Sequence, residues 1–172
     1  MAKPIVAILM GSDSDYDYML EACKSLQKFS ICYEILVSSA HRTPEKTQKY
    51  VKSAKGKGIK VFIAGAGGAA HLAGVIAAET TLPVIGVPIP STSLNGLDSI
   101  LAISQMPGGI PVATMATGKA GAKNAGLLAA QILGTSDPDL SLKLSQYKKD
   151  MAEEVDKKDK KLREVHAQNY PS

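Results

Sequence analysis

The sequence predicts an α/β domain with a parallel sheet covered by helices on both faces. Apolar runs of strand length alternate along the chain with amphipathic segments of helix length, the pattern of successive βα units. At 172 residues the chain fits a single hydrophobic core. Hydrophobic residues make up 45% and Trp is absent, so we expect an aliphatic core.

Five apolar runs are expected as strands. They cover residues 5–10, 33–37, 60–64, 83–87 and 112–115. Helices are expected between and after these strands, at residues 16–29, 44–55, 71–79, 97–105 and 121–133.

The composition changes after residue 136. Asp137-Pro138-Asp139 predicts a helix start, and the chain is then densely charged to about Val165, with only a thin apolar stripe. We therefore expect an α/β domain over residues 1–136 and a helical extension of the same domain over 137–172. The extension could pack on its own domain or on a neighbouring subunit, and its length and polarity favour the neighbour.

Charge and cysteine content argue against several classes of protein. The net charge is +4, but residues 137–172 hold eight basic and eight acidic residues, and the excess is scattered over residues 1–136. The sequence has no basic stripe with interleaved aromatic residues, so we do not expect nucleic-acid binding. Cys23 and Cys32 form no CxxC or Cys/His cluster, so neither a disulfide framework nor a zinc site is indicated. The first apolar run is too short to span a bilayer, and we expect a cytoplasmic protein without membrane attachment.

The middle of the chain lacks basic residues. No Lys or Arg occurs between Val61 and Gly118, where small and apolar residues are abundant. Part of such a segment belongs in the centre of a sheet, and the rest would form an apolar surface that soluble monomers rarely keep. On this ground we expect a homo-oligomer.

The first candidate site loop is Gly11-Ser12-Asp13-Ser14-Asp15, after the first expected strand. Ligands of open parallel sheets bind outside the carboxyl ends of the strands. The hydroxyls here face a helix N-terminus, which suits a phosphate or a carboxylate, and Asp15 could accept hydrogen bonds from ribose hydroxyls. Plain helix capping explains the same residues equally well.

The second loop, residues 38–44, contains His41 beside Arg42. Arg42 offers a planar fork for an anion, and His41 titrates near neutral pH and can carry a proton in either direction. A lone loop histidine is usually only solvated. The neighbouring anion-binding Arg and the place at a strand's carboxyl end favour a catalytic role for His41.

The third and fourth loops carry small residues instead of nucleophiles. Residues 65–74 are mainly Gly and Ala, whose small side chains let a ligand touch backbone N–H groups. His71 either lines a pocket there or simply starts a helix. A dinucleotide site is disfavoured because Val37 leads into two serines, where an acidic residue would be needed. Residues 88–96 and 105–111 hold no paired carboxylates, metal-ligand cluster or nucleophile with a base.

Four motifs follow one another along the chain. They are Gly11-Ser12-Asp13-Ser14-Asp15, Ser39-Ala40-His41-Arg42-Thr43-Pro44, Gly65-Ala66-Gly67-Gly68-Ala69-Ala70-His71-Leu72 and Gln105-Met106-Pro107-Gly108-Gly109-Ile110-Pro111-Val112-Ala113-Thr114. In this order, over about residues 5–133, the chain resembles the N5-carboxyaminoimidazole ribonucleotide mutases of purine biosynthesis. Residues 118–125 add a fifth matching motif.

The resemblance implies a three-layer αβα flavodoxin-like domain assembled into a homo-octamer, without metal, ATP or organic cofactor. It implies an isomerase that converts N5-carboxyaminoimidazole ribonucleotide to 4-carboxy-5-aminoimidazole ribonucleotide. By position it makes His41 the general acid and base, with Ser39 at the phosphate end and His71 at the carboxylate. The substrate-binding residues that it implies are Ser12, Asp15, Ser39, Arg42, Gly67, Ala70 and His71.

Two alternatives stay open. A sister class carboxylates aminoimidazole ribonucleotide with free CO2 and typically has Lys after the loop histidine, whereas this chain has Arg42. A non-catalytic flavodoxin-like module that binds a nucleotide or flavin would use the same crevice. The chain departs from the family at Tyr16, Ala73 and Thr117, where Trp, Pro and Ile are frequent, and we expect these changes to alter packing only.

Overall fold

The computed structural model describes residues 3–169 and divides the chain into two compact units, Met1–Leu133 and Gly134–Ser172. The first unit contains a five-stranded sheet in the order β2-β1-β3-β4-β5, and every neighbouring pair is parallel. The strands are β1 (Val6–Met10), β2 (Tyr33–Val37), β3 (Val61–Gly67), β4 (Val84–Ile89) and β5 (Ala113–Thr114). The predicted fold class is therefore confirmed.

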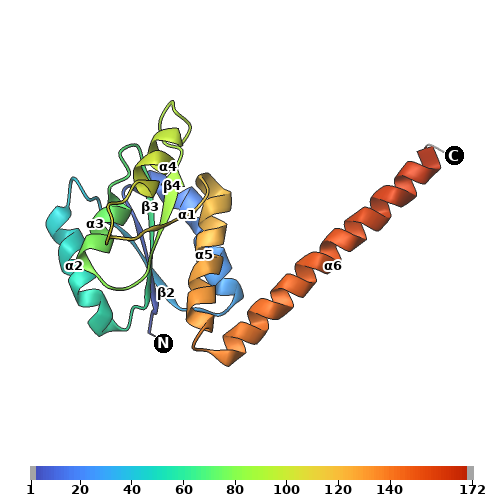
Figure 1. The fold of residues 1–172 in the computed structure, drawn as a ribbon, viewed down its shortest axis with the longest axis horizontal. Helices are drawn as coiled ribbons and strands as arrows, with labels where there is room; N and C mark the ends of the chain where they lie inside the picture. Colours follow the sequence, from blue (N-terminus) through green and yellow to red (C-terminus); the bar gives the residue numbers. More distant parts are fainter. Residues whose placement is uncertain (1–2, 170–172) are drawn as a thin grey trace. The chain divides into compact units, whose positions relative to one another are not determined.

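Helices cover both faces of the sheet, giving three layers (Figure 1). In chain order they are η1 (Asp13–Asp15), α1 (Tyr16–Lys28), α2 (Pro44–Lys57), α3 (Leu72–Glu79), α4 (Leu97–Ser104) and α5 (Gly118–Gly134). α1 and α5 lie on one face, and α2, α3 and α4 lie on the other. This arrangement buries the sheet on both sides, as parallel sheets require.

The core is aliphatic, as the composition predicts. All five residues of β1 are buried, because this strand pairs with both β2 and β3 and lies under helices on both faces. On one face Leu9 and Phe62 of the sheet pack in a cluster with Val51 of α2, Ile76 of α3 and Ile103 of α4. Burial of such side chains contributes roughly 1.5–3 kcal/mol each, so this layer contributes substantially to stability.

The central strands run further than the local pattern predicts. β3 continues through Gly65, Ala66 and Gly67 because these residues pair in register with Val87, Pro88 and Ile89 of β4. A proline interrupts a ladder only where its missing N–H would be needed. On the β5 side, β4 pairs through Ile85 and Gly86, and Pro88 lies beyond these residues. The missing N–H of Pro88 therefore interrupts no pairing with β5, and β4 continues to Ile89.

The second unit contains α6 (Pro138–Asn169), a helix of 32 residues. Asp137 caps it, since its side-chain Oδ1 accepts a hydrogen bond from the Leu140 N–H at 3.0 Å. The predicted helical extension is thus present. Among the described residues, no helix is both long and apolar enough to cross a membrane.

Candidate functional site

The strand order sets the position of the site. The chain runs from β1 outward to β2 and then returns across β1 to β3, so the loops after β1 and β3 diverge at this reversal. A crevice is expected at such a point, at the carboxyl ends of the strands. A cavity of about 380 Å³ lies there, lined by Gly11, Ser12, Ser14, Asp15, Ser39, Ala40, His41, Arg42, Ala66, Gly67, Ala70, His71, Leu72 and Ser91. All eight site residues expected from the sequence are in this lining.

The loop after β1 forms a capping box. The Ser12 side chain accepts a hydrogen bond from the Ser14 N–H at 3.3 Å, and Asp15 Oδ2 accepts one from the Ser12 N–H at 3.2 Å. Ser12 and Asp15 therefore do cap the helix start, as the capping interpretation predicts. Both residues also line the cavity, so capping and ligand binding are compatible.

Asp15 is a buried carboxylate, with 5% of its surface exposed. Burial raises its pKa above the ordinary value, against the lowering effect of the hydrogen bonds from the Ser12 backbone and the Ser14 side chain. A buried carboxylate next to a cavity costs stability, which is the expected mark of a group kept for binding.

The loop after β2 holds its shape through its own polar groups. The Ser39 side chain accepts a hydrogen bond from the Arg42 N–H at 3.2 Å, and the Ser39 N–H donates to Thr43 Oγ1 at 3.0 Å. Arg42 Nη2 donates to the Gly11 carbonyl at 3.3 Å, which ties this loop to the loop after β1. That bond uses one of five guanidinium donors and leaves the others for an anion.

The loop after β3 turns through the left-handed region twice. Gly68 has φ +59°, and Ala70 has φ +49°, a conformation that non-glycine residues seldom adopt. The Ala70 N–H donates to the Gly67 carbonyl at 3.1 Å, closing a tight turn immediately before His71. The strain at Ala70 is stored where the chain must present His71 to the cavity.

His41 and His71 meet inside the site. Nε2 of His41 lies 2.7 Å from Nδ1 of His71, and the rings are nearly perpendicular, with centroids 4.8 Å apart. One ring must donate and the other accept. A proton added to the pair therefore goes to an outer nitrogen, His41 Nδ1 or His71 Nε2, if the shared hydrogen bond is to survive. The pair can accept and release a proton at nearly constant geometry.

Sequence reasoning missed several lining residues, of which Ser91 is the most informative. It follows β4, and a Cβ added at Gly67 would collide with its side chain and lie 2.9 Å from the Ile89 carbonyl oxygen. The loop after β4 thus closes directly over the end of β3. The signal was present, since Ser91 also follows a strand, but only the pairing of β3 with β4 brings it to this cavity.

The site contains proton carriers and anion binders but no metal cluster. In the described part of the chain, no group of three or more His, Cys, Asp or Glu side chains could hold a metal ion. An imidazole pair, a guanidinium, a buried carboxylate and several hydroxyls can bind a small anion and move one proton on it.

Comparison with known proteins now identifies the family. The model of the AIR carboxylase family matches residues 5–154. A Pyrococcus horikoshii protein named N5-carboxyaminoimidazole ribonucleotide mutase is 56% identical over 170 residues, which cover 99% of this chain and 95% of that protein. The chain belongs to the AIR carboxylase family.

Two further relatives agree with this assignment. A Bacillus subtilis protein, also named N5-carboxyaminoimidazole ribonucleotide mutase, is 57% identical over 153 residues, covering 89% of this chain and 94% of that protein. The crystal structure of Treponema denticola PurE has a TM-score of 0.84 at 33% identity, covering 93% of this chain and 99% of that chain. The flavodoxin-like fold is therefore shared with an experimental structure.

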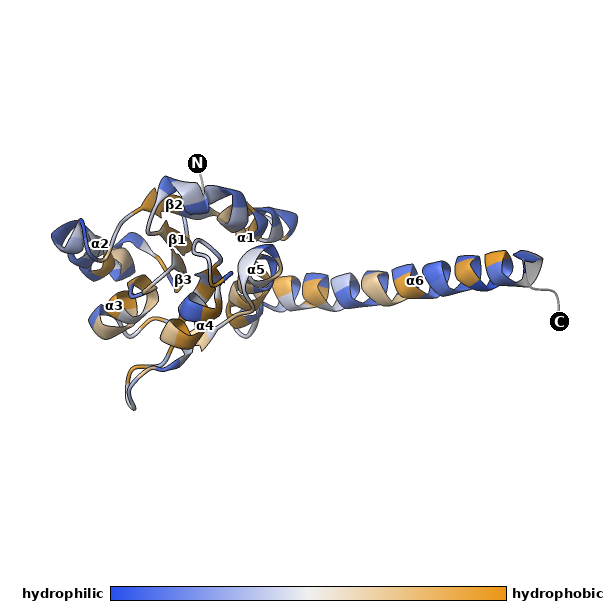
Figure 2. Ribbon diagram, turned by 90° about the horizontal axis from the view of Figure 1, so that it is seen from above, coloured by the Kyte–Doolittle hydropathy of each residue, from blue (hydrophilic) through white to orange (hydrophobic). Residues whose placement is uncertain are grey.

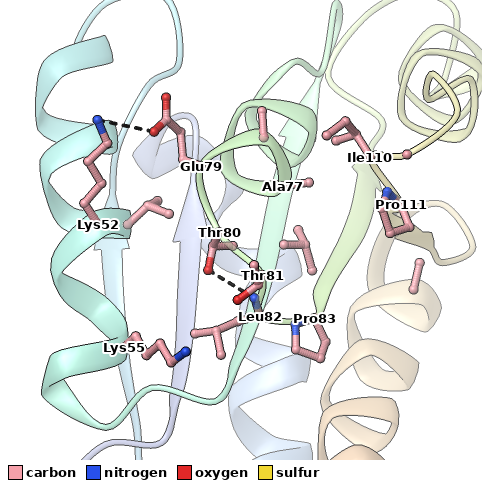
Figure 3. A pocket seen from close by; sticks show the side chains of 15 residues that line it. Lys52, Lys55, Ala77, Glu79, Thr80, Thr81, Leu82, Pro83, Ile110 and Pro111 are labelled. Carbon is pink, nitrogen blue, oxygen red and sulfur yellow. Dashed lines mark hydrogen bonds and ion pairs between the residues drawn. The ribbon is translucent and has the colours of Figure 1, made fainter.

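A larger cavity of this AIR carboxylase family member lies at the opposite edge of the sheet (Figure 3). Its volume is about 910 Å³, and it lies where α2 and α3 end and β4 begins. Its wall is mostly aliphatic, and its charged groups include Lys52 and Glu79, which face each other at 3.5 Å. It holds no histidine or arginine, so the smaller cavity is the better candidate for chemistry.

Proposed function

We propose that this chain is an isomerase of de novo purine biosynthesis that converts N5-carboxyaminoimidazole ribonucleotide to 4-carboxy-5-aminoimidazole ribonucleotide. The observation that carries the proposal is the His41–His71 contact in a cavity that Arg42 also lines. The names of the Pyrococcus horikoshii and Bacillus subtilis relatives support the same reaction.

The chemistry needs one proton and no net change in charge. In the first half, the bond between the carboxylate carbon and the exocyclic nitrogen breaks, CO2 leaves, and the nitrogen gains a proton to become an amine. In the second half, C4 of the imidazole attacks the trapped CO2, a carbon–carbon bond forms, and C4 loses its proton. One group that first donates and then accepts a proton completes the cycle.

His41 is the proposed proton carrier. An imidazole can donate a proton from one ring nitrogen and accept one at the other, so a single histidine can serve both halves of the reaction. His71 touches His41 at 2.7 Å and can stabilise whichever form is needed by donating to it or accepting from it. The perpendicular rings leave an outer nitrogen of His41 for the substrate.

The remaining lining residues divide between the two ends of the substrate. Arg42 and the hydroxyls of Ser12 and Ser39 suit the ribonucleotide and its phosphate, and Asp15 suits ribose hydroxyls. Gly67, Ala70 and His71 suit the carboxylate and the released CO2. A neutral linear molecule can be held only by close contact and backbone N–H groups, and small side chains allow that approach.

The decisive experiment mixes the purified protein with N5-carboxyaminoimidazole ribonucleotide in bicarbonate-free buffer without ATP. We expect the C-carboxylated product to form and aminoimidazole ribonucleotide not to accumulate. Product formation only after CO2 is added would assign the sister reaction, direct carboxylation of aminoimidazole ribonucleotide. Binding of the ribonucleotide without any turnover would favour the non-catalytic module and contradict the proposal.

Assembly as a homo-oligomer, an octamer by resemblance to the family, is part of the proposal. Leu94, Leu97 and Leu101, in the segment without basic residues, are 57%, 56% and 49% exposed. Three neighbouring leucines on the α4 side make an apolar surface that a second subunit would cover. Sedimentation at micromolar concentration should give a single large species, and a stable monomer would contradict this part.

The domain and cellular assignments follow from the same proposal. Residues 1–136 would form the catalytic domain, and residues 137–172 would pack on a neighbouring subunit. Cys23 and Cys32 are free thiols, as suits a reducing compartment, so we place the enzyme in the cytoplasm. Its partners would be a small ribonucleotide and copies of itself, with no nucleic acid or membrane.

A further inference from the structure

α6 carries a heptad repeat that the proposed reaction does not use. One face of the helix is followed from Leu144 in alternating steps of four and three residues. The residues on it are Leu144, Lys148, Met151, Val155, Lys158, Leu162 and Val165. Five of these seven positions are apolar. Among the other residues from 145 to 166, only Tyr147 and Ala152 are apolar, and the rest are polar or charged. The hydropathy colours alternate along α6 accordingly (Figure 2).

The stripe has the period of a coiled coil. An apolar pattern that repeats every seven residues keeps facing a second helix, whereas a lone helix cannot bury its own stripe. Val155, Leu162 and Val165 are 63%, 67% and 45% exposed. The match to the AIR carboxylase family model ends at residue 154, so the last turns of the stripe lie outside the region that defines the family.

We infer that α6 forms an antiparallel coiled coil with α6 of a second copy of this chain. In the central register, Met151 lies opposite Leu162 of the second copy, and Val155 lies opposite Lys158 of the second copy. Each lysine stem then covers a valine, while its ammonium group extends to water at the edge. The outermost layer pairs Lys148 with Val165 in the same way.

Charge decides the direction of pairing. In the antiparallel register, Glu154 lies opposite Lys161 of the second copy, and symmetry forms this pair twice. A parallel pair in register would instead stack Lys148 on Lys148 and Lys158 on Lys158, and would set Glu154 near Asp159 of the second copy. Symmetry forms the Glu154–Asp159 contact twice, so the parallel alternative carries four repulsive contacts that the antiparallel pair avoids.

The first test uses disulfide trapping in the full-length chain. The variant Met151→Cys/Leu162→Cys is made together with Cys32→Ser, while buried Cys23 stays. The two new cysteines are about 16 Å apart along one helix, beyond the reach of a disulfide, so any bond between them joins two chains. We expect mild oxidation to give covalent dimers in which peptide mapping finds position 151 bonded to position 162.

Bonds from 151 to 151 and from 162 to 162 would show a parallel pair and overturn the inference. Failure to crosslink at all would also overturn it. Turnover of the ribonucleotide, measured on the same samples, reports separately on the proposed function.

The second test exchanges the charges. Glu154→Lys and Lys161→Glu should each slow the formation of 151–162 crosslinks by about fivefold or more, because each turns two attractive contacts repulsive. The double variant Glu154→Lys/Lys161→Glu should restore the original rate. Glu153→Lys, one residue away on the opposite side of α6, makes the same charge change and should leave the rate unaltered. A double variant that crosslinks no faster than the single ones would exclude this register.

Discussion

The two ends of the parallel sheet differ in the chemistry that they can support; we call them the carboxyl edge and the amino edge, after the strand ends that lie there. The cavity at the carboxyl edge is the smaller, about 380 Å³ against about 910 Å³, yet His41, His71, Arg42 and Asp15 line it. The larger cavity at the amino edge is walled mainly by aliphatic residues. Convergent polar groups mark a site better than volume does.

The direction of the chain explains the difference. Loops that leave the carboxyl ends of the strands lead into helix N-termini, whose free N–H groups attract anions. Loops at the amino edge follow helix C-termini, which attract cations, and Lys55 lies in the last turn of α2 there. An anionic substrate is therefore expected at the carboxyl edge, and the variants below test this comparison.

The largest effect is expected for His41→Asn. Loss of the proton carrier should lower turnover by about 10² to 10⁴-fold with little change in substrate binding. The control is His166→Asn on α6, which makes the same change outside both cavities. Steady-state kinetics would measure both variants, and an active His41→Asn enzyme would refute catalysis at this edge.

Gly67→Ala should be the next most damaging. Its added Cβ would collide with the Ser91 side chain and approach the Ile89 carbonyl oxygen to 2.9 Å. Moving the loop after β4 should cost about 1–3 kcal/mol of stability and partly fill the site. In contrast, Gly56→Ala in α2 meets nothing within 4 Å and should stabilise by up to about 1 kcal/mol. Denaturant unfolding would compare the two, and equal outcomes would show that the site tolerates the extra carbon.

Asp15→Asn should weaken substrate binding while improving stability near neutral pH. Burial raises the pKa of the Asp15 carboxyl, so its contribution to stability is fully present below the unfolded value and is lost as pH rises through the folded one. The advantage of the variant in melting temperature should therefore grow as the pH rises above the ordinary aspartate pKa of about 3.9 and through the raised value of the folded protein. Asp13→Asn, at an exposed neighbour, should show no such trend. A difference in melting temperature that does not change with pH would show that burial does not destabilise the charged form of the Asp15 carboxyl group.

The smallest effect is expected at the amino edge. Lys55→Ala removes a cation from the wall of the larger cavity and should leave turnover within about twofold of the parent. A large loss of turnover in a variant that folds normally would show that the amino edge also contributes to the reaction.

Much of the fold was predictable from short-range pattern. The hydrophobic period, two residues in a strand and 3.6 in a helix, depends only on neighbours along the chain. For this reason β2 (Tyr33–Val37) has the predicted bounds, and α1 differs from its prediction by one residue. The same holds for the site loops, since glycine, serine and histidine after a strand are visible in the sequence. The Gly11 and His41 loops were identified for this reason.

By itself, the sequence determined which segments form strands and helices and which loops carry chemistry, because local backbone preferences decide these. Only the tertiary structure decided that His41 and His71, thirty residues apart, share a hydrogen bond. It also decided that Ser91 closes over Gly67 and that β4 continues through Pro88. These contacts depend on which strands pair side by side, a choice made by burial over the whole sheet and not by any one segment.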